Sequence, residues 1–201
     1  MNTTSALNPE AHHLDLGCGA IPRNPYYAEN LYGVDVRSRL DEGKKIKFSK
    51  ANLIFEKIPY VDNTFDSVST YDFLEHIPRV IFINGDTAFS FINLMNEIYR
   101  VLKPNGKFYA ITPVYPKESG FVDPTHVNFI TQNTHKYFTY PHNWASMYGF
   151  EGSFSLMQSK LVNFDLEVNK RIWYKLIAKR ILSILNIKSR QHIKWEFCAL
   201  K

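Results

Sequence analysis

The chain has 201 residues, a formal net charge of +5, 45% hydrophobic residues and 21% charged residues. This composition is ordinary for a globular protein, so we expect residues 1–201 to form a single domain with a sizeable core. No apolar run approaches the roughly 18 residues that span a bilayer, and no signal pattern opens the chain. The two cysteines fall inside apolar runs, which favours reduced thiols in a cytoplasmic protein over a disulfide.

A glycine turn follows the first predicted strand, at residues 12–18. This apolar run carries one carboxylate, Asp15, and breaks into Gly17-Cys18-Gly19, where a ligand can approach the backbone closely. The second predicted strand, at residues 31–36, has Asp35 near its end. A glycine turn followed by an acid at the end of the next strand is how a doubly wound sheet binds a nucleoside. The start of the chain therefore predicts a nucleoside site.

The connection between these two strands is short for a doubly wound sheet. Residues 20–30 contain Pro22 and Pro25 and leave room for a turn or two of helix at most. We therefore expect a shortened first crossover. The polar residues 1–10 are expected to be a flexible start of the chain.

The following elements are several strands and one strong helix. The helix predicted at residues 86–102 has Phe91, Leu94 and Ile98 on one face, and the segment 103–106 stops it. Further strands are predicted at residues 45–50, 66–71, 107–112, 152–168 and 190–200.

Two later segments have distinctive compositions. Residues 113–150 are loop-like and rich in Pro, His and Tyr, and a long loop after a central strand is where α/β enzymes hold their substrates. Residues 170–187 predict an inserted basic amphipathic helix, with seven basic residues up to Arg190 and no acid. This helix either packs on the sheet with a solvated basic face, or contacts an anionic lipid surface or a phosphate-bearing substrate through residues 170–190.

Four blocks of the sequence, taken together and in order, resemble the class I S-adenosylmethionine-dependent methyltransferases. They are residues 14–19, residues 32–35, residues 62–68 together with 73–77, and residues 96–107. The resemblance implies an α/β, Rossmann-like, doubly wound fold, with a mostly parallel seven-stranded sheet and an antiparallel last strand. Residues 22–25, the loop at 123–127 and the basic helix are similar to small bacterial members associated with surface-polysaccharide genes.

The resemblance implies S-adenosylmethionine as the cofactor. Asp15 would anchor its ammonium or only order the glycine turn, and Asp35 would accept its ribose hydroxyls. Asn52 stands where the family usually has an acid for the adenine, and an amide can still accept a hydrogen bond from the adenine amino group. The expected cofactor-binding residues are Asp15, Gly17, Cys18, Gly19, Asp35, Val36, Asn52, Leu53, Tyr71 and Asp72.

Methyl transfer to a hydroxyl needs a base, and histidine is the expected one. His126 lies in the long loop beside Asp123, which could orient it, and His76 follows the fourth strand together with Glu75. In related enzymes this Glu-His pair lies near the reaction centre, and in some it participates in metal binding. Turn formation and packing remain alternative roles for all of these residues. No Cys/His spacing predicts zinc, so no metal is expected, and His12 and His13 are expected at a strand edge.

The function expected first is methyl transfer to a small-molecule acceptor, with a sugar or sugar-nucleotide hydroxyl as the target. The mild positive charge permits an anionic acceptor without requiring nucleic acid. An RNA or protein methyltransferase ranks lower, because the chain has no appended binding domain. A non-enzymatic module that binds the cofactor, or once did, and acts through contacts with a partner is a third alternative.

Overall fold

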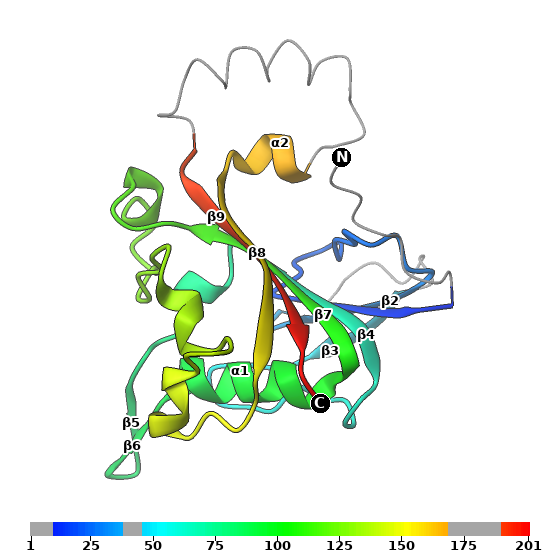
Figure 1. Cartoon of the computed structure of the whole chain (residues 1–201), viewed down its shortest axis with the longest axis horizontal. Coiled ribbons are helices and arrows are strands. Elements are labelled where there is room, and N and C mark those ends of the chain that lie inside the picture. The colour runs from blue at the N-terminus through cyan, green and yellow to red at the C-terminus, as the bar shows by residue number, and fades with distance from the viewer. Residues whose placement is uncertain (1–9, 38–45, 169–189) are drawn as a thin grey trace.

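The computed structural model describes residues 10–37, 46–168 and 190–201 (Figure 1). The main sheet consists of seven strands: β1 (His12–Leu16), β2 (Asn30–Asp35), β3 (Ile46–Lys50), β4 (Phe65–Tyr71), β7 (Leu102–Pro113), β8 (Phe154–Val162) and β9 (His192–Ala199). A separate hairpin consists of β5 (Ile81–Ile83) and β6 (Asp86–Ala88). In the described part of the chain, the helices are α1 (Ser90–Val101), α2 (Phe164–Val168) and four 3-10 helices, η1 (Leu74–His76), η2 (Glu118–Gly120), η3 (Thr134–Tyr137) and η4 (Trp144–Tyr148).

The strand order is β3-β2-β1-β4-β7-β9-β8. The pairs from β3 to β7 are parallel, whereas β9 runs antiparallel to β7 and β8 antiparallel to β9. This confirms the predicted Rossmann-like α/β fold with its antiparallel last strand. The carboxyl ends of β1, β2, β4 and β7 therefore lie along one side of the sheet, here called the carboxyl edge. Ligands bind at this edge in doubly wound folds.

The first crossover, predicted to hold a turn or two of helix at most, contains no helix between β1 and β2. It packs tightly on the sheet because β2 offers a glycine: a Cβ on Gly33 would lie 2.7 Å from both Cys18 Sγ and Pro22 Cγ. The crossover is closed by Asn24, whose amide donates to the Ala28 carbonyl at 2.7 Å and accepts from the Ala28 N–H at 3.1 Å. A pair of side-chain hydrogen bonds thus replaces the usual helix.

One face of the sheet is apolar and is covered by α1, which runs along the lower side of the sheet in Figure 1. The helix buries an apolar stripe because Phe91, Leu94 and Ile98 recur at helical spacing. These side chains belong to one cluster with the fully buried Phe108 of β7 and Trp195 of β9. We call this the apolar face.

The opposite face carries buried polar side chains, and we call it the polar face. The Tyr26 hydroxyl donates to Glu196 Oε1 at 2.9 Å, and Lys194 Nζ bonds Glu167 Oε1 at 3.0 Å. Lys194 is only 3% exposed, so its charge is balanced within the fold. The apolar contacts of this face form a second, smaller cluster: Tyr26, Tyr71, Tyr109, Ile111 and Val162, with Phe164 and Val168 packed against it.

Some predicted boundaries are wrong for local reasons. The helix begins at Ser90 rather than residue 86, because the β5–β6 hairpin precedes it. Asn84 and Gly85 both have positive φ, +52° and +90°, which a two-residue hairpin turn requires. The strand predicted at residues 152–168 ends at Val162, because the Asn163 side chain accepts the Leu166 N–H and starts α2.

One further prediction, for His13, is wrong, and two others concern residues that the structure does not describe. The predicted strand-edge position of His13 is wrong: β1 lies between β2 and β4, and His13 is completely buried. The basic helix predicted at residues 170–187 and nearly all of the flexible start at 1–10 lie outside the described residues. Within the described residues, no helix has the length and hydropathy needed to cross a membrane.

Candidate active site

The glycine turn follows β1 and is hydrogen-bonded to the carboxyl end of β2. Gly17 and Gly19 have φ values of +63° and +61°, a conformation that glycine adopts without strain. The Gly17 and Cys18 N–H groups donate to the Val34 carbonyl at 2.9 and 3.2 Å. The Gly19 N–H donates to Asp35 Oδ2 at 2.8 Å. The turn and Asp35 are therefore adjacent, as the nucleoside hypothesis requires.

Asp35 is an ionised acceptor at this edge. Burial alone would raise its pKa, but the N–H groups of Arg37 and Gly19 and the Arg37 guanidinium outweigh burial and lower it. Arg37 Nε lies 3.2 Å from Asp35 Oδ1, and the Arg37 side chain is 77% exposed. An exposed arginine can move aside for a ligand at little cost, because solvent screens its ion pair.

Asp15 lies beneath the turn rather than beside open space. Its residue is 1% exposed, and each carboxylate oxygen has a protein donor: the Ser69 hydroxyl at 2.6 Å and the Arg23 N–H at 2.7 Å. Burial raises the pKa of Asp15 to about 7. Asp15 therefore fixes the start of the crossover to β1, and this ordering role exists without any ligand.

The remaining expected cofactor residues follow neighbouring strands. Asn52 comes after β3, its Oδ1 accepts the Ile54 N–H at 3.2 Å, and Leu53 beside it is buried. Val36 is 54% exposed after β2. Asp72 has a positive φ of +46°, and its carboxylate lies 3.2 Å from His192 Nε2.

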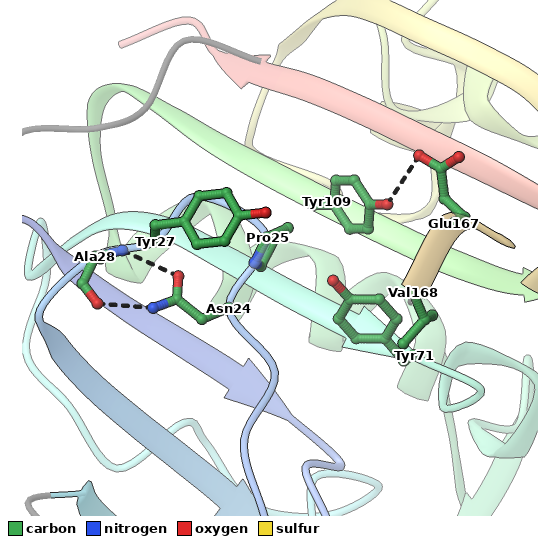
Figure 2. Close-up of a pocket in the computed structure, with 8 residues that line it drawn as sticks. All are labelled: Asn24, Pro25, Tyr27, Ala28, Tyr71, Tyr109, Glu167 and Val168. Carbon is green, nitrogen blue, oxygen red and sulfur yellow. Dashed lines mark hydrogen bonds between the residues drawn. The ribbon is translucent and has the colours of Figure 1, made fainter. Parts of the chain in front are cut away.

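Tyr71, the last residue of β4, faces a pocket on the polar face. The pocket has a volume of about 360 Å³ and is lined by Asn24, Pro25, Tyr27, Ala28, Tyr71, Tyr109, Glu167 and Val168. Figure 2 shows Tyr71 and Tyr109 side by side, with the Tyr109 hydroxyl directed at Glu167. Arg23 covers the Tyr71 ring at 4.9 Å. Of the ten expected cofactor residues, only Tyr71 lines this pocket.

The structure brings His76 and His126 together at the carboxyl edge, 50 positions apart in sequence. Their ring centroids lie 4.8 Å apart, edge to face. His76 comes from η1, directly after β4, and His126 comes from the loop after β7. Two backbone hydrogen bonds fasten that loop to η1: the Val127 and Asn128 N–H groups each donate to the Glu75 carbonyl at 2.9 Å.

Glu75 lies behind the two histidines and is 1% exposed. Its Oε2 accepts the Thr112 hydroxyl at 2.9 Å, whereas Oε1 has no hydrogen-bond partner and lies 3.9 Å from His126 Nε2. Burial raises the pKa of Glu75 to about 8. We call Glu75, His76 and His126 the histidine cluster.

The Asp123 carboxylate is linked to His76 rather than to the His126 ring, whereas the Asp123 carbonyl accepts the His126 backbone N–H at 3.1 Å. Its Oδ1 accepts both the N–H and the hydroxyl of Thr125, at 2.8 and 2.6 Å. The Thr125 Oγ1 lies 3.0 Å from His76 Nδ1. His126 is held instead by the Gly120 carbonyl, 3.3 Å from its Nδ1. The expected trio is thus assembled, with Thr125 as the link that the sequence reasoning missed.

The cluster adjoins the glycine turn through one aromatic ring. A Cβ on Gly17 would lie 2.4 Å from the Phe73 ring, so the ring packs directly on the turn. Phe73 is the residue before η1, which carries Glu75 and His76. A ligand at the turn and a second ligand at the cluster would therefore be neighbours.

Comparison with known proteins agrees with this architecture. Residues 14–110 match the model of a methyltransferase domain. The chain has no significant match among curated proteins.

Three solved structures illustrate the shared fold. An S-adenosylmethionine-dependent methyltransferase from Mesorhizobium loti is 12% identical with a TM-score of 0.55, covering 96% of this chain and 94% of its own. The YcgJ protein from Bacillus subtilis is 17% identical with a TM-score of 0.52, covering 98% and 92%. A Listeria monocytogenes protein assigned to the same methyltransferase class is 12% identical with a TM-score of 0.58, covering 98% and 95%. At these identities the structures show the fold alone.

The sheet order and the glycine turn define a Rossmann-like α/β fold of the kind found in class I methyltransferases. Together with the matched methyltransferase domain, this fold supports S-adenosylmethionine-dependent methyl transfer as the activity.

Proposed function

We propose that this enzyme methylates a hydroxyl of a small-molecule acceptor, a sugar or sugar nucleotide, bound between the carboxyl edge and the loop at residues 113–150. The observation that carries the proposal is the histidine cluster, which sets a fixed imidazole next to the glycine turn. A hydroxyl is a poor nucleophile until its proton is removed or shared, whereas many softer acceptors need no base.

The residues at the carboxyl edge fit S-adenosylmethionine. Where a Cβ of Gly19 would stand, the nearest group is Arg37 Nη2 at 3.7 Å, so the turn has room for a ligand. In our proposal the Gly17-Cys18-Gly19 backbone holds the methionyl end, Asp35 accepts the ribose hydroxyls, and Asn52 with Leu53 contacts the adenine. When bound, the cofactor supplies an electrophilic methyl group on a positive sulfonium.

His126 is the proposed base. The Gly120 carbonyl can only accept, so His126 Nδ1 donates to it and Nε2 retains a lone pair. A nitrogen in this state can take the proton of a hydroxyl, and such general-base assistance contributes roughly 10²- to 10⁴-fold in rate. We therefore expect His126→Gln to lower the turnover number by at least about 100-fold while leaving cofactor affinity unchanged.

Exposed aromatic rings beside His126 support a sugar acceptor. Phe121 and Phe129 stack with centroids 5.2 Å apart, and Tyr115 lies 6.0 Å from Phe121. All three are 42–52% exposed. The apolar C–H face of a sugar ring can pack on such a surface, because aromatic rings contribute large contact area.

The test incubates the full chain with methyl-labelled cofactor and a panel of nucleotide sugars, with transfer RNA and a protein extract as competitors. Label in one sugar nucleotide, abolished by His126→Gln, supports the proposal. Label only in RNA or protein would overturn the acceptor class. Calorimetry showing no cofactor binding would favour a non-catalytic module instead.

A further inference from the structure

We propose that the histidine cluster binds a divalent transition-metal ion, with Glu75, His76 and His126 as its protein ligands. The ligating atoms that these residues offer all lie within 4.8 Å of one another. The resemblance pointed only to the Glu75-His76 pair; the structure adds His126, which comes from a loop 50 residues later and could not be assigned to the same site from sequence spacing.

The first argument is an unsatisfied buried oxygen. Glu75 is 1% exposed, and its Oε1 has no hydrogen-bond partner. Buried polar atoms without a partner are costly and rare in native proteins. This oxygen faces His126, with Nε2 3.9 Å away. A cation between the carboxylate and the imidazole would satisfy it.

The second argument is the orientation of the two imidazoles. His126 Nδ1 must donate, because its partner is the Gly120 carbonyl. The Thr125 hydroxyl donates its proton to Asp123, so it can only accept from His76 Nδ1. Both rings therefore use Nδ1–H outside the cluster and keep the Nε2 lone pair. Metal-binding histidines are typically fixed in this way, with the second nitrogen donating to a carbonyl, a carboxylate or another acceptor.

The third argument is the chemistry of the donor set. Two imidazoles and one carboxylate suit zinc, iron, manganese or cobalt, whereas magnesium and calcium prefer oxygen donors alone. Ligand atoms in a closed zinc site lie about 3.3–3.5 Å apart, given metal–ligand distances near 2.1 Å. The side chains need only move inward by roughly half an ångström to an ångström each, and His76 is only partly buried. Three protein ligands leave a coordination position open.

The role of the ion in the reaction rests on the proposed function. An ion with an open position would hold the acceptor's hydroxyl oxygen beside the methyl donor. His126 would then be a ligand rather than a free base, so the metal titration below also separates these two roles.

The experiment titrates the metal-stripped full chain with zinc chloride by calorimetry, with manganese and magnesium chloride as comparisons. We expect one zinc equivalent, weaker manganese binding and no comparable magnesium binding. Glu75→Gln and His126→Gln should each weaken zinc affinity at least about tenfold. His142→Ala is the matched control, because His142 is an exposed histidine outside the cluster and should leave zinc affinity unchanged.

Folding is checked by circular dichroism, and His76→Gln replaces Glu75→Gln if the buried change prevents folding. Zinc affinity that is absent, or equal in wild type and in His76→Gln and His126→Gln, overturns the site. A chain that methylates sugars without binding zinc would leave the proposed function standing and remove the metal. A chain that binds zinc at the cluster but methylates no hydroxyl would confirm the metal site and overturn the proposed function.

Discussion

The two faces of the sheet are built by different means, and neighbouring residues on β7 show it. Phe108 is fully buried on the apolar face, in one cluster with α1. Tyr109, the next residue, lies on the polar face, where its ring packs against Tyr26 and Tyr71 with centroids 6.2 and 5.5 Å away. The apolar face is sealed by a long helix. Within the described residues, the polar face is covered by turns and the short α2, and it retains a pocket.

The difference shows what the missing crossover helix makes possible. Because turns cover the polar face, polar side chains can be buried there and satisfied one by one. His13 Nδ1 lies 2.6 Å from the Ser67 hydroxyl, and its Nε2 lies 2.9 Å from the Ser69 hydroxyl, which donates to Asp15. We infer that the apolar face supplies most of the stability, while the polar face orders the glycine turn.

The largest expected loss of stability comes from a substitution on the apolar face. Phe108→Ala should lower the free energy of unfolding by about 3–5 kcal/mol, because it removes a fully buried ring and leaves a cavity. Tyr109→Phe on the polar face is the matched change and should cost less than about 1 kcal/mol, since its hydroxyl makes only a long 3.4 Å bond to Glu167. Urea unfolding measures both. Equal losses would contradict the division between the faces.

The next largest loss of stability is expected at the glycine turn, on which the apolar face packs. Phe73 packs on the apolar cluster and on Gly17, so Gly17→Ala both strains the backbone and displaces this ring. We expect a loss of about 2–4 kcal/mol in the free energy of unfolding, with weaker cofactor binding. Gly19→Ala should cost only about 1–2 kcal/mol, because its surroundings are open. The reverse order would show that Phe73 does not constrain the turn.

A smaller loss of stability is expected from a substitution on the polar face. Ser69→Ala removes a hydroxyl that bonds both His13 and Asp15, so we expect a loss of about 1–3 kcal/mol in unfolding free energy. Ser67→Ala, the control, removes a single contact to His13 and should cost less. Cofactor titration completes the test: Ser69→Ala should weaken binding if the network orders the turn, whereas unchanged affinity would limit the network to stability.

The smallest expected effect in the wild-type chain is its pH slope, because two opposite contributions largely cancel. Burial lowers the pKa of His13 from 6.5 to about 3, so the unfolded chain takes up a proton first and stability is lost as pH falls from 6.5. Burial raises the pKa of Asp15 from 3.8 to about 7, so the folded chain holds the extra proton and stability is lost as pH rises from 3.8 to 7. Between pH 4 and 6.5 these contributions oppose each other.

Asp15→Asn should remove the opposing contribution and leave the pH dependence of His13 visible. Its unfolding free energy, measured by urea titration, should fall on acidification from pH 6.5 to 4 more steeply than that of wild type, by about 1.4 kcal/mol per pH unit. His13→Gln should steepen the fall on the other side, as pH rises from 4 to 7. Parallel curves for all three proteins would mean that neither residue is protonated differently in the folded and unfolded states.

Much of the fold could be predicted from local pattern. The strands at residues 12–18, 31–36 and 66–71 correspond to β1, β2 and β4, because apolar runs that end in turn residues report burial directly. The shortened crossover followed from its two prolines. The hairpin was missed although Asn84-Gly85 is a strong two-residue turn signal.

The candidate site was only partly predictable. His76, His126 and Asp123 were chosen for their chemistry and their place after central strands, and the structure gathers them at one edge. The contacts between them could not be read from the sequence, since Thr125 carries the interaction of Asp123 to His76. The burial of Asp15 was equally hidden, because the Ser69 hydroxyl beneath it belongs to β4.

By itself, the sequence determined where the main strands begin and end along the chain, the glycine turn and the acid at the end of β2. These features depend on residues that are close together in the chain. Only the tertiary structure decided which face of the sheet became polar, which oxygen of Glu75 stayed unsatisfied and which nitrogens of the two histidines remained available. Those outcomes depend on partners from β4, β7 and the loop after β7, and they exist only once the parallel strands bring these segments to a common edge.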